Sequence, residues 1–286
     1  MKKKLFIAIF IILFITISLT RSLADVIAYL QNSQLGTVFL SISTNQNTSK
    51  VTTILESPTI NKTNGNQYWL NSGAMYYVQG SLGQTIQGDL SKYSQWRLLY
   101  SITNPTDTDD GYHPQNIFRL ITKNLLSSST TEEVYMRITK DNLSKSPNRN
   151  ISNGIFLMSR YVDADNLYYA GIRVDGTAVI KEKINGVYHT LAQKQVFSGD
   201  SYNRDSNPNL LPKHQWIGMK MKIQTIDKNT VKIDLFLDPT DSGSWDETLS
   251  TTDTIQKGAT PIFNPGRAGM RTDFMDVEFR NYTYTS

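Results

Sequence analysis

Residues 154–192 read GIFLMSRYVDADNLYYAGIRVDGTAVIKEKINGVYHTLA, and this stretch decides the fold class. It contains Asp175-Gly176 and Asn185-Gly186, each flanked by β-branched and aromatic residues. These dipeptides are strong hairpin signals, because both residues of a tight two-residue turn need φ > 0. A longer, acidic connection runs over residues 162–166. The stretch therefore predicts four consecutive antiparallel strands.

The two turns also predict which side chains share a face of the sheet. A two-residue turn at Asp175-Gly176 would place Tyr169 opposite Glu182, and a turn at Asn185-Gly186 would place Glu182 opposite His189. We expect these three side chains to form one row across the strands. Neither face of the stretch is wholly apolar, which fits a large curved sheet that is partly open to solvent or ligand.

The rest of the chain predicts further short strands and little helix. Trp96, Leu98, Tyr100 and Ile102 alternate with other residues over 95–103, which predicts a half-buried strand. Residues 238–265 are expected to be irregular. In all we expect about 12 to 15 strands, with others at residues 36–43, 50–56, 116–123, 132–140, 215–226, 230–237, 268–274 and 277–284.

Many short antiparallel strands joined by long polar loops predict an all-β fold, a two-sheet antiparallel β-sandwich of the jelly-roll type. The chain has no cysteine, so neither a disulfide nor a catalytic thiolate is available, and apolar burial must stabilise the fold.

Two groups of segments resemble the central and last strands of concanavalin A-like lectin and glucanase domains, including the laminin G-like type. They are LYYAGIRVDG at 167–176 with the segments that follow it to residue 192, and GMRT at 269–272 with VEFRNY at 277–282. The resemblance implies a jelly roll and a carbohydrate ligand. It does not separate lectins from glycoside hydrolases or polysaccharide lyases, which share this fold.

The first 24 residues predict a signal peptide. They hold three lysines, an apolar run over residues 5–19, and a small-x-small site at Ser22-Leu23-Ala24. An uncleaved membrane anchor is the alternative, although the run is shorter than the ~20 residues of a spanning helix. We expect residues 25–286 to form one secreted or cell-surface domain with no membrane segment after cleavage.

Removing this leader changes the net charge. It holds four of the 29 basic residues and no acidic residue, so the mature chain has 25 basic and 25 acidic groups. A neutral surface argues against nucleic acid and anionic membranes as partners. It leaves neutral glycans open as partners, so a carbohydrate polymer stays possible, and it allows acidic glycans only through a local basic patch.

Catalysis by paired carboxylates is not supported. Retaining glucanases of the resembled superfamily carry acids on alternate positions of one strand, but Phe274 stands where the motif before Asp276 needs an acid. A lyase would need a Tyr or His base and a polar or cationic group beside a uronate carboxylate. Residues 168–171, YYAG, resemble one strand motif of alginate lyases, whose accompanying Gln-x-His motif is absent. The candidate catalytic residues are Tyr169, His189, Arg173, Arg160 and Glu182; the alternative is a row of side chains that only stabilises the sheet.

For sugar binding, we expect Trp245, in a Ser/Gly/Asp loop, to be exposed for stacking, with Tyr169 and Arg173 as further ligand contacts. The resemblance also implies structural calcium. Two acidic loops are candidates, one with Asp107 and Asp109 and one with Asp163 and Asp165. Ordinary solvated turns are the alternative for both.

Three hypotheses follow: a domain that binds polysaccharide without cleaving it, a polysaccharide lyase or glycoside hydrolase of the same fold, and a cell-surface adhesion protein. If the protein is an enzyme, we expect a groove lined by Arg, His, Tyr and carboxylate side chains. If it is a lectin, we expect a groove lined by aromatic and amide side chains. An adhesion protein predicts a flat apolar patch.

Overall fold

The computed structural model describes residues 51–63, 67–255 and 260–286. The predicted leader, its cleavage point and the strand expected at residues 36–43 lie outside the described residues. Within them are fifteen β-strands, the helix α3 (Gln95–Thr103) and the short 3-10 turns η2 (Ile60–Lys62) and η3 (Pro114–Asn116). None of the described helices has the length and apolar character needed to cross a membrane.

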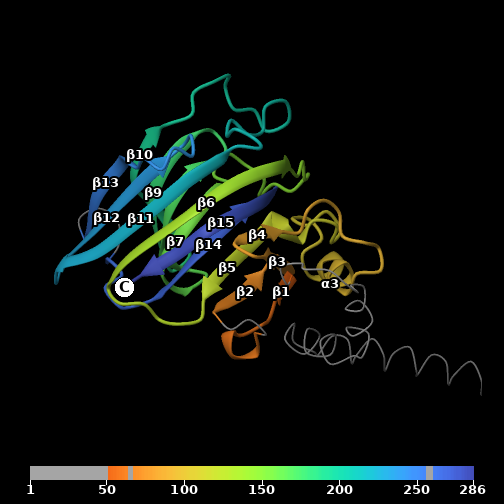
Figure 1. Ribbon diagram of the computed structural model, residues 1–286, viewed down its shortest axis with the longest axis horizontal. Coiled ribbons are helices and arrows are strands. Elements are labelled where there is room, and N and C mark those ends of the chain that lie inside the picture. The colour runs from red at the N-terminus through yellow and green to blue at the C-terminus, as the bar shows by residue number, and fades with distance from the viewer. Residues whose placement is uncertain (1–50, 64–66, 256–259) are drawn as a thin grey trace, which may run out of the picture. The chain divides into compact units, whose positions relative to one another are not determined.

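Eight strands form one antiparallel sheet, in the order β1-β3-β4-β15-β6-β11-β12-β13 (Figure 1). Their bounds are β1 Val51–Leu55, β3 Met75–Gln79, β4 Leu82–Thr85, β15 Met275–Thr285, β6 Ser129–Asp141, β11 Trp216–Asp227, β12 Thr230–Asp238 and β13 Asp246–Thr254.

Seven strands form the second antiparallel sheet, in the order β10-β9-β8-β7-β14-β5-β2. Their bounds are β10 Val187–Gln195, β9 Thr177–Ile184, β8 Asn166–Arg173, β7 Gly154–Asp163, β14 Arg267–Asp273, β5 Ile117–Thr122 and β2 Tyr68–Ser72. The four strands predicted over residues 154–192 are β7 to β10, and they are consecutive neighbours in this sheet.

The two sheets enclose the main hydrophobic core. The seven-stranded sheet contributes alternate residues such as Leu157, Ala170 and Ile180, and the eight-stranded sheet contributes others such as Met219 and Ile233. The opposite face of the seven-stranded sheet carries a second, smaller cluster of buried apolar side chains: Ile121, Phe156, Met158, Tyr161, Leu167, Tyr169 and Val179. The predicted all-β, two-sheet antiparallel sandwich is confirmed.

The strand predicted over residues 95–103 is wrong, because this segment is the helix α3. Trp96, Leu99 and Tyr100 are its buried residues, and their spacing is that of one helix face. Leu98 is 59% exposed, whereas Leu99 is 3% exposed. The alternation of large residues was therefore coincidental, and the helical spacing within it was the better guide.

The predicted register of β8 and β9 is also wrong, by one residue. Tyr169 lies opposite Lys181, and Tyr168 lies opposite Glu182. The connecting loop has three residues instead of two: Gly176 N–H donates to the carbonyl of Arg173 at 2.9 Å, and Gly176 alone takes a positive φ, of 78°. A type I turn followed by a left-handed glycine gives this geometry.

The second hairpin turn matches its prediction. Asn185 and Gly186 have φ of 49° and 83°, and Glu182 lies opposite His189. Four strands were missed elsewhere. β2 and β3 lie in an aromatic-rich segment to which no strand was assigned, β4 lies in a glycine-containing segment that resembled a loop, and β13 lies within the segment expected to be irregular.

Candidate functional site

A cavity of about 420 Å³ lies over the outer face of the seven-stranded sheet, the face turned away from the main core. This volume falls within the range of about 300 to 1,000 Å³ that is usual for small-molecule sites. The sheet contributes Phe156, Tyr169, Lys181, Tyr188 and Arg271 to its wall. The others lie at strand ends, in the turn η3 or in loops; they are Asp107, Asn116, Ile117, Asn148, Asn150, Ser152, Asn153, Asp273 and Phe274.

Strand alternation explains why these sheet residues share one face. Lys181 lies opposite Tyr169 on β8, and Arg271 on β14 lies opposite Phe156 on β7. Their neighbours along the strands, such as Tyr168 and Met270, point into the main core. A period of two therefore separates core residues from cavity residues on each of these strands.

Arg271 connects the two tyrosines of the cavity. Its Nη1 donates to the phenol oxygen of Tyr169 at 3.1 Å and to that of Tyr188 at 3.4 Å. Its Nε donates to Oδ1 of Asp273 at 2.8 Å. The two tyrosine rings are stacked, with centroids 6.1 Å apart and planes at 27°. This network fixes the position of the aromatic wall.

The same contacts shift two pKa values. Burial opposes the charge of Arg271, but Asp273 and the two phenols outweigh it, and the pKa of Arg271 is raised well above its ordinary value. Burial would also raise the pKa of Tyr188. The charge of Arg271 and its hydrogen bond, together with Lys183, outweigh that effect and lower the pKa of Tyr188.

Two buried acceptor oxygens on the cavity wall have no hydrogen-bond partner among the described residues. They are Oδ2 of Asp273 and Oδ1 of Asn116. The other atoms of these side chains are engaged: Asn116 donates to the carbonyl of Asp107 at 2.8 Å, and Asp273 pairs with Arg271. Buried polar atoms are usually satisfied, so these oxygens indicate a place for water or for ligand hydroxyl groups.

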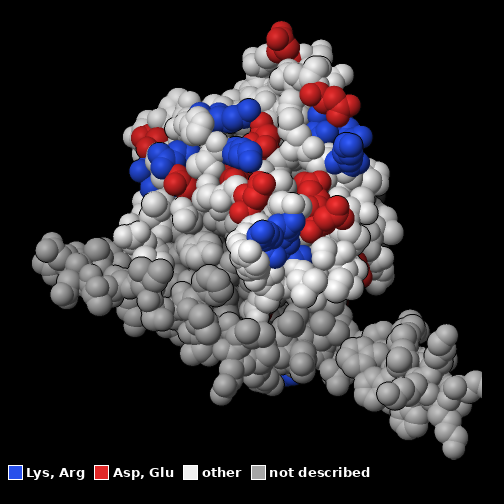
Figure 2. Space-filling model, turned by 90° about the vertical axis from the view of Figure 1, so that its right-hand side faces the viewer, with Lys and Arg blue, Asp and Glu red and all other residues white. Residues whose placement is uncertain are grey.

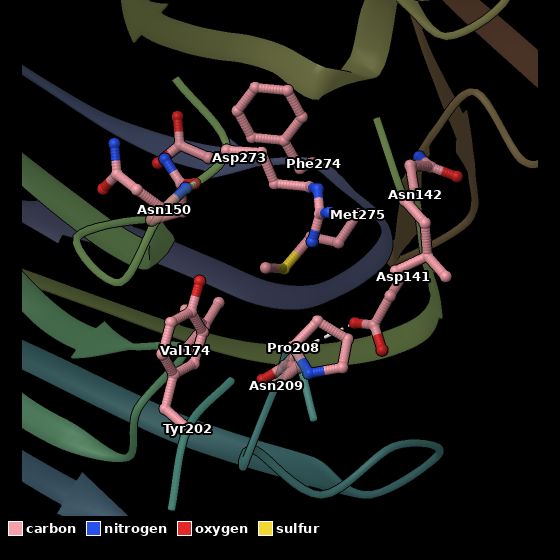
Figure 3. Close-up of a pocket in the computed structure, with 13 residues that line it drawn as sticks. Asp141, Asn142, Asn150, Val174, Tyr202, Pro208, Asn209, Asp273, Phe274 and Met275 are labelled. Atoms are coloured by element: carbon pink, nitrogen blue, oxygen red, sulfur yellow. Dashed lines mark hydrogen bonds between the residues drawn. The ribbon is translucent and has the colours of Figure 1, made fainter. Parts of the chain in front are cut away.

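A second, much smaller cavity of about 20 Å³ lies beside the first (Figure 3). Asn150, Asn153, Asp273 and Phe274 line both cavities. In Figure 3, Asn209 donates to Asp141 on the far wall of this space, at 2.7 Å. A space of this size holds about one water molecule, so it is a packing gap and not a sugar site.

The structure does not assemble the predicted catalytic set. Tyr169 faces the cavity, whereas Glu182 and His189 lie opposite each other in a row with Tyr168, on the other face of the sheet. The predicted Tyr169, Glu182 and His189 row is therefore wrong, because the turn at Gly176 shifts the register. Arg173, at the end of β8, is paired with Asp175.

Glu182 and Arg160 are buried inside the protein and do not line the cavity. Glu182 is fully buried, and burial, reinforced by Asp253, raises its pKa to about 8. Tyr168 donates to Asp253 across the sandwich at 2.6 Å. Arg160 is also buried and donates to the carbonyls of Ile262 and Ser128. Both side chains thus interact with other protein groups, Arg160 with backbone carbonyls and Glu182 with Asp253.

Trp245 lies just before β13 and packs against the eight-stranded sheet, away from the cavity. It is half-buried, with its ring centroid 5.5 Å from that of Tyr135 and 4.0 Å from Nζ of Lys220. Trp245 was expected to be exposed, but it is half-buried. The ring is covered because Gly218, directly beneath it, leaves room for close packing.

The four proposed calcium ligands contact other protein groups. Asp107 accepts from Ser146 and Asn148, and Asp109 accepts from His113 at 2.9 Å. Asp163 accepts from Asn166, and Asp165 pairs with Lys183. The described part of the chain contains no group of three or more His, Cys, Asp or Glu side chains that could hold a metal. Calcium binding at either loop stays a prediction, which melting curves recorded with and without chelator would test.

Sequence reasoning missed most of the cavity wall. Lys181, Tyr188, Arg271 and Asp273 were not singled out as site residues. The correct register of β8 and β9 would have pointed to Lys181. The dense Asn and Ser content of residues 148–153 was a further signal, because amide groups are suited to hydroxyl ligands.

The fold and the cavity together define an all-β, two-sheet antiparallel sandwich with a ligand-sized cavity on the outer face of its seven-stranded sheet. No family model matches the chain, and no curated protein matches its sequence.

Solved structures resemble this fold. A carbohydrate-binding module from Bacillus subtilis is 13% identical, with a TM-score of 0.46, over 78% of this chain and 98% of that one. The carbohydrate recognition domain of Emp46p, in its metal-free form, is 10% identical, with a TM-score of 0.38, over 76% and 87%. A native glycosidic hydrolase is 13% identical, with a TM-score of 0.38, over 85% and 96%. These proteins differ too much from this chain for their ligands to indicate which ligand this chain binds.

Proposed function

We propose that this chain is an exported, carbohydrate-binding domain of the concanavalin A-like type, and that it holds part of a polysaccharide in the 420 Å³ cavity. The leader predicted at residues 1–24 supports export. One observation carries the binding proposal: unpartnered, buried acceptor oxygens of Asp273 and Asn116 line the same cavity as the stacked Tyr169 and Tyr188. Sugars offer hydroxyl donors for such oxygens and C–H faces for aromatic rings.

Binding without cleavage fits the two carboxylates of the cavity. Asp107 accepts hydrogen bonds from Ser146 and Asn148, and Asp273 is paired with Arg271. A glycosidase needs one carboxylate free to attack or to activate water and a second that donates a proton. Asp107 holds the loop residues Ser146 and Asn148, and Asp273 holds Arg271 through Oδ1, so the two carboxylates are not arranged as a catalytic pair. Oδ2 of Asp273, which has no partner among the described residues, remains available for a ligand hydroxyl group.

A polysaccharide lyase is the second candidate, because one observation favours it. The pKa of Tyr188 is lowered by Arg271, and elimination beside a uronate carboxylate needs a base with a cation near it. The cavity thus gathers Arg, Tyr and carboxylates as well as amides. The only histidine of the predicted catalytic set, His189, lies on the other face of the sheet.

Affinity electrophoresis of the purified protein tests this proposal, using gels that contain a panel of neutral and acidic polysaccharides. We expect at least one polysaccharide to retard the protein, with no rise in unsaturated-uronate absorbance and no new reducing ends in parallel incubations. A rise in that absorbance would favour the lyase. Unchanged migration of folded protein in every gel would refute carbohydrate binding.

A further inference from the structure

We infer that the cavity takes the anionic group of an acidic sugar, carboxylate or sulfate, with Lys181 and Arg271 as the residues that bind it. This inference rests on the proposed carbohydrate function and names the substrate class of the same site.

Lys181 is the first observation. It is half-buried on the cavity wall, and its ammonium makes no ion pair or hydrogen bond among the described residues. Its nearest aromatic contact is loose, with Nζ 5.9 Å from the centroid of Tyr188. A charge that loses part of its hydration is stabilised when an opposite charge takes the place of the water. The missing partner is therefore expected to come from a ligand.

Three neighbouring cations show that this situation is specific to Lys181. Arg271 contacts Asp273, Arg173 contacts Asp175, and Lys183 contacts Asp165. Each of these cations already has a carboxylate at contact distance. Lys181 lies among them with none of its own.

Like charges also surround Lys181. Burial lowers its pKa, and the nearby Arg173 and Arg271 lower it further, while Tyr188 and Asp175 act in the opposite direction. An anion bound beside Lys181 would relieve both the loss of hydration and the repulsion. Anion binding and the protonated form of Lys181 should therefore reinforce each other.

Arg271 supplies a second donor. Its Nε and Nη1 are used by Asp273 and the two tyrosines, but its Nη2 makes no hydrogen bond among the described residues. Arg271 and Lys181 line the same cavity. An anionic group bound in the cavity can thus receive a charge-assisted hydrogen bond from Arg271, which is stronger than one between neutral groups.

The attraction is local, not a property of the whole surface. The chain without its leader is predicted to be neutral, and on the face drawn in Figure 2 acidic and basic side chains are interspersed. Binding should therefore depend on the geometry of one anionic group, not on the total charge of the polymer.

A matched set of polymers tests this inference. Polygalacturonate and alginate are each compared with their methyl esters, and dextran sulfate with dextran, in affinity gels. We expect wild-type protein to bind an acidic polymer about tenfold more tightly than its uncharged counterpart, the effect of about one charge-assisted hydrogen bond. Retention by uronates alone assigns a carboxylate ligand, and retention by dextran sulfate alone assigns a sulfated one.

Three variants complete the test. Lys181→Gln should bind acidic and uncharged polymers alike, and Lys181→Arg should restore the preference. Lys222→Gln is the matched control, because Lys222 is exposed on β11 of the other sheet, and it should behave as wild type. Melting curves confirm that each variant is folded.

The failures of the two proposals are distinguishable. Equal binding of acidic polymers and their uncharged counterparts by wild type, or an unchanged preference in Lys181→Gln, would overturn the acidic-sugar inference while leaving carbohydrate binding in place. Absence of binding to all six polymers would overturn both.

Discussion

Tyr169 and Lys181 are directly opposite partners on the antiparallel ladder of β8 and β9. Both side chains lie on the outer face of the seven-stranded sheet and line its cavity. A shift of one residue would turn Lys181 toward the main core and bring Glu182 to the cavity, because side chains alternate between faces. The three-residue turn that ends at Gly176 therefore decides which charge this surface presents.

The turn itself is testable at Gly176. Its φ is 78°, and a Cβ added there would lie 2.1 Å from the carbonyl oxygen of Phe197. Because backbone strain and a steric clash both result, Gly176→Ala should destabilise the fold by about 1 to 3 kcal/mol. Urea denaturation measures this change; a variant as stable as wild type would argue against the turn described.

The seven-stranded sheet should be equally intolerant of a small addition where β7 and β8 lie close together. A Cβ at Gly171 would lie 2.2 Å from the carbonyl oxygen of Ile155 on the adjacent strand, whereas a Cβ at Gly199 would meet no atom within 4 Å. We expect Gly171→Ala to lower the melting temperature clearly and Gly199→Ala, its control, to leave it almost unchanged. Similar melting temperatures for the two variants would contradict the close approach of β7 and β8.

Glu132 should make stability depend on pH. It is fully buried on β6, accepts a hydrogen bond from Gly269 N–H of the opposite sheet at 3.2 Å, and burial raises its pKa to about 8. The unfolded chain, with an ordinary pKa near 4.5, binds fewer protons between those two values. The contribution of Glu132 is therefore greatest below about pH 4.5 and is lost as pH rises toward 8.

Glu132→Gln stays neutral at every pH and should remove this part of the slope. Each pKa unit corresponds to about 1.4 kcal/mol, so the variant should gain a few kcal/mol relative to wild type between pH 5 and pH 8. Urea denaturation at both pH values gives the comparison. Parallel pH profiles for the two proteins would show that Glu132 is charged in the folded state.

Tyr188 should ionise before the tyrosines whose pKa is raised by burial. Its pKa is lowered by Arg271 and Lys183, whereas burial raises the pKa of Tyr68 to about 12. Ultraviolet titration of wild type should show an early phenolate component that is absent from Tyr188→Phe. If the titration of Tyr188→Phe keeps the early component, the physical basis for Tyr188 as a base is removed.

The main features of the fold could be predicted because they depend on local signals. Asn185-Gly186 specifies a tight turn by itself, and alternation of apolar residues over β11 and β12 identifies both strands. The α3 segment could not be assigned by alternation, because Trp96 and Tyr100 satisfy both a period of two and one helical turn. Only burial of Leu99 in place of Leu98 distinguishes them.

The cavity was harder to predict because it depends on long-range pairing. Arg271 reaches Tyr169 and Tyr188 because β14 pairs with β7, more than a hundred residues earlier in the chain, and no local pattern specifies that pairing. Lys181 required the correct loop length at Gly176, since Asp-Gly is compatible with both two- and three-residue turns. Of the predicted site residues, Tyr169 and Asp107 line the cavity, and Asp107 was predicted as a calcium ligand and not as a sugar contact.

The central claim is that carbohydrate binds in this cavity, and calorimetric titration with the polysaccharide that retards the protein most tests it directly. Tyr188 is 48% exposed and lines the cavity, whereas Tyr93 is 75% exposed and does not line it. We expect Tyr188→Ala to weaken binding about tenfold, or ~1.4 kcal/mol, and Tyr93→Ala and Trp245→Ala to bind as wild type. Wild-type affinity in Tyr188→Ala together with loss of binding in Trp245→Ala would contradict the claim and move the ligand to the opposite sheet.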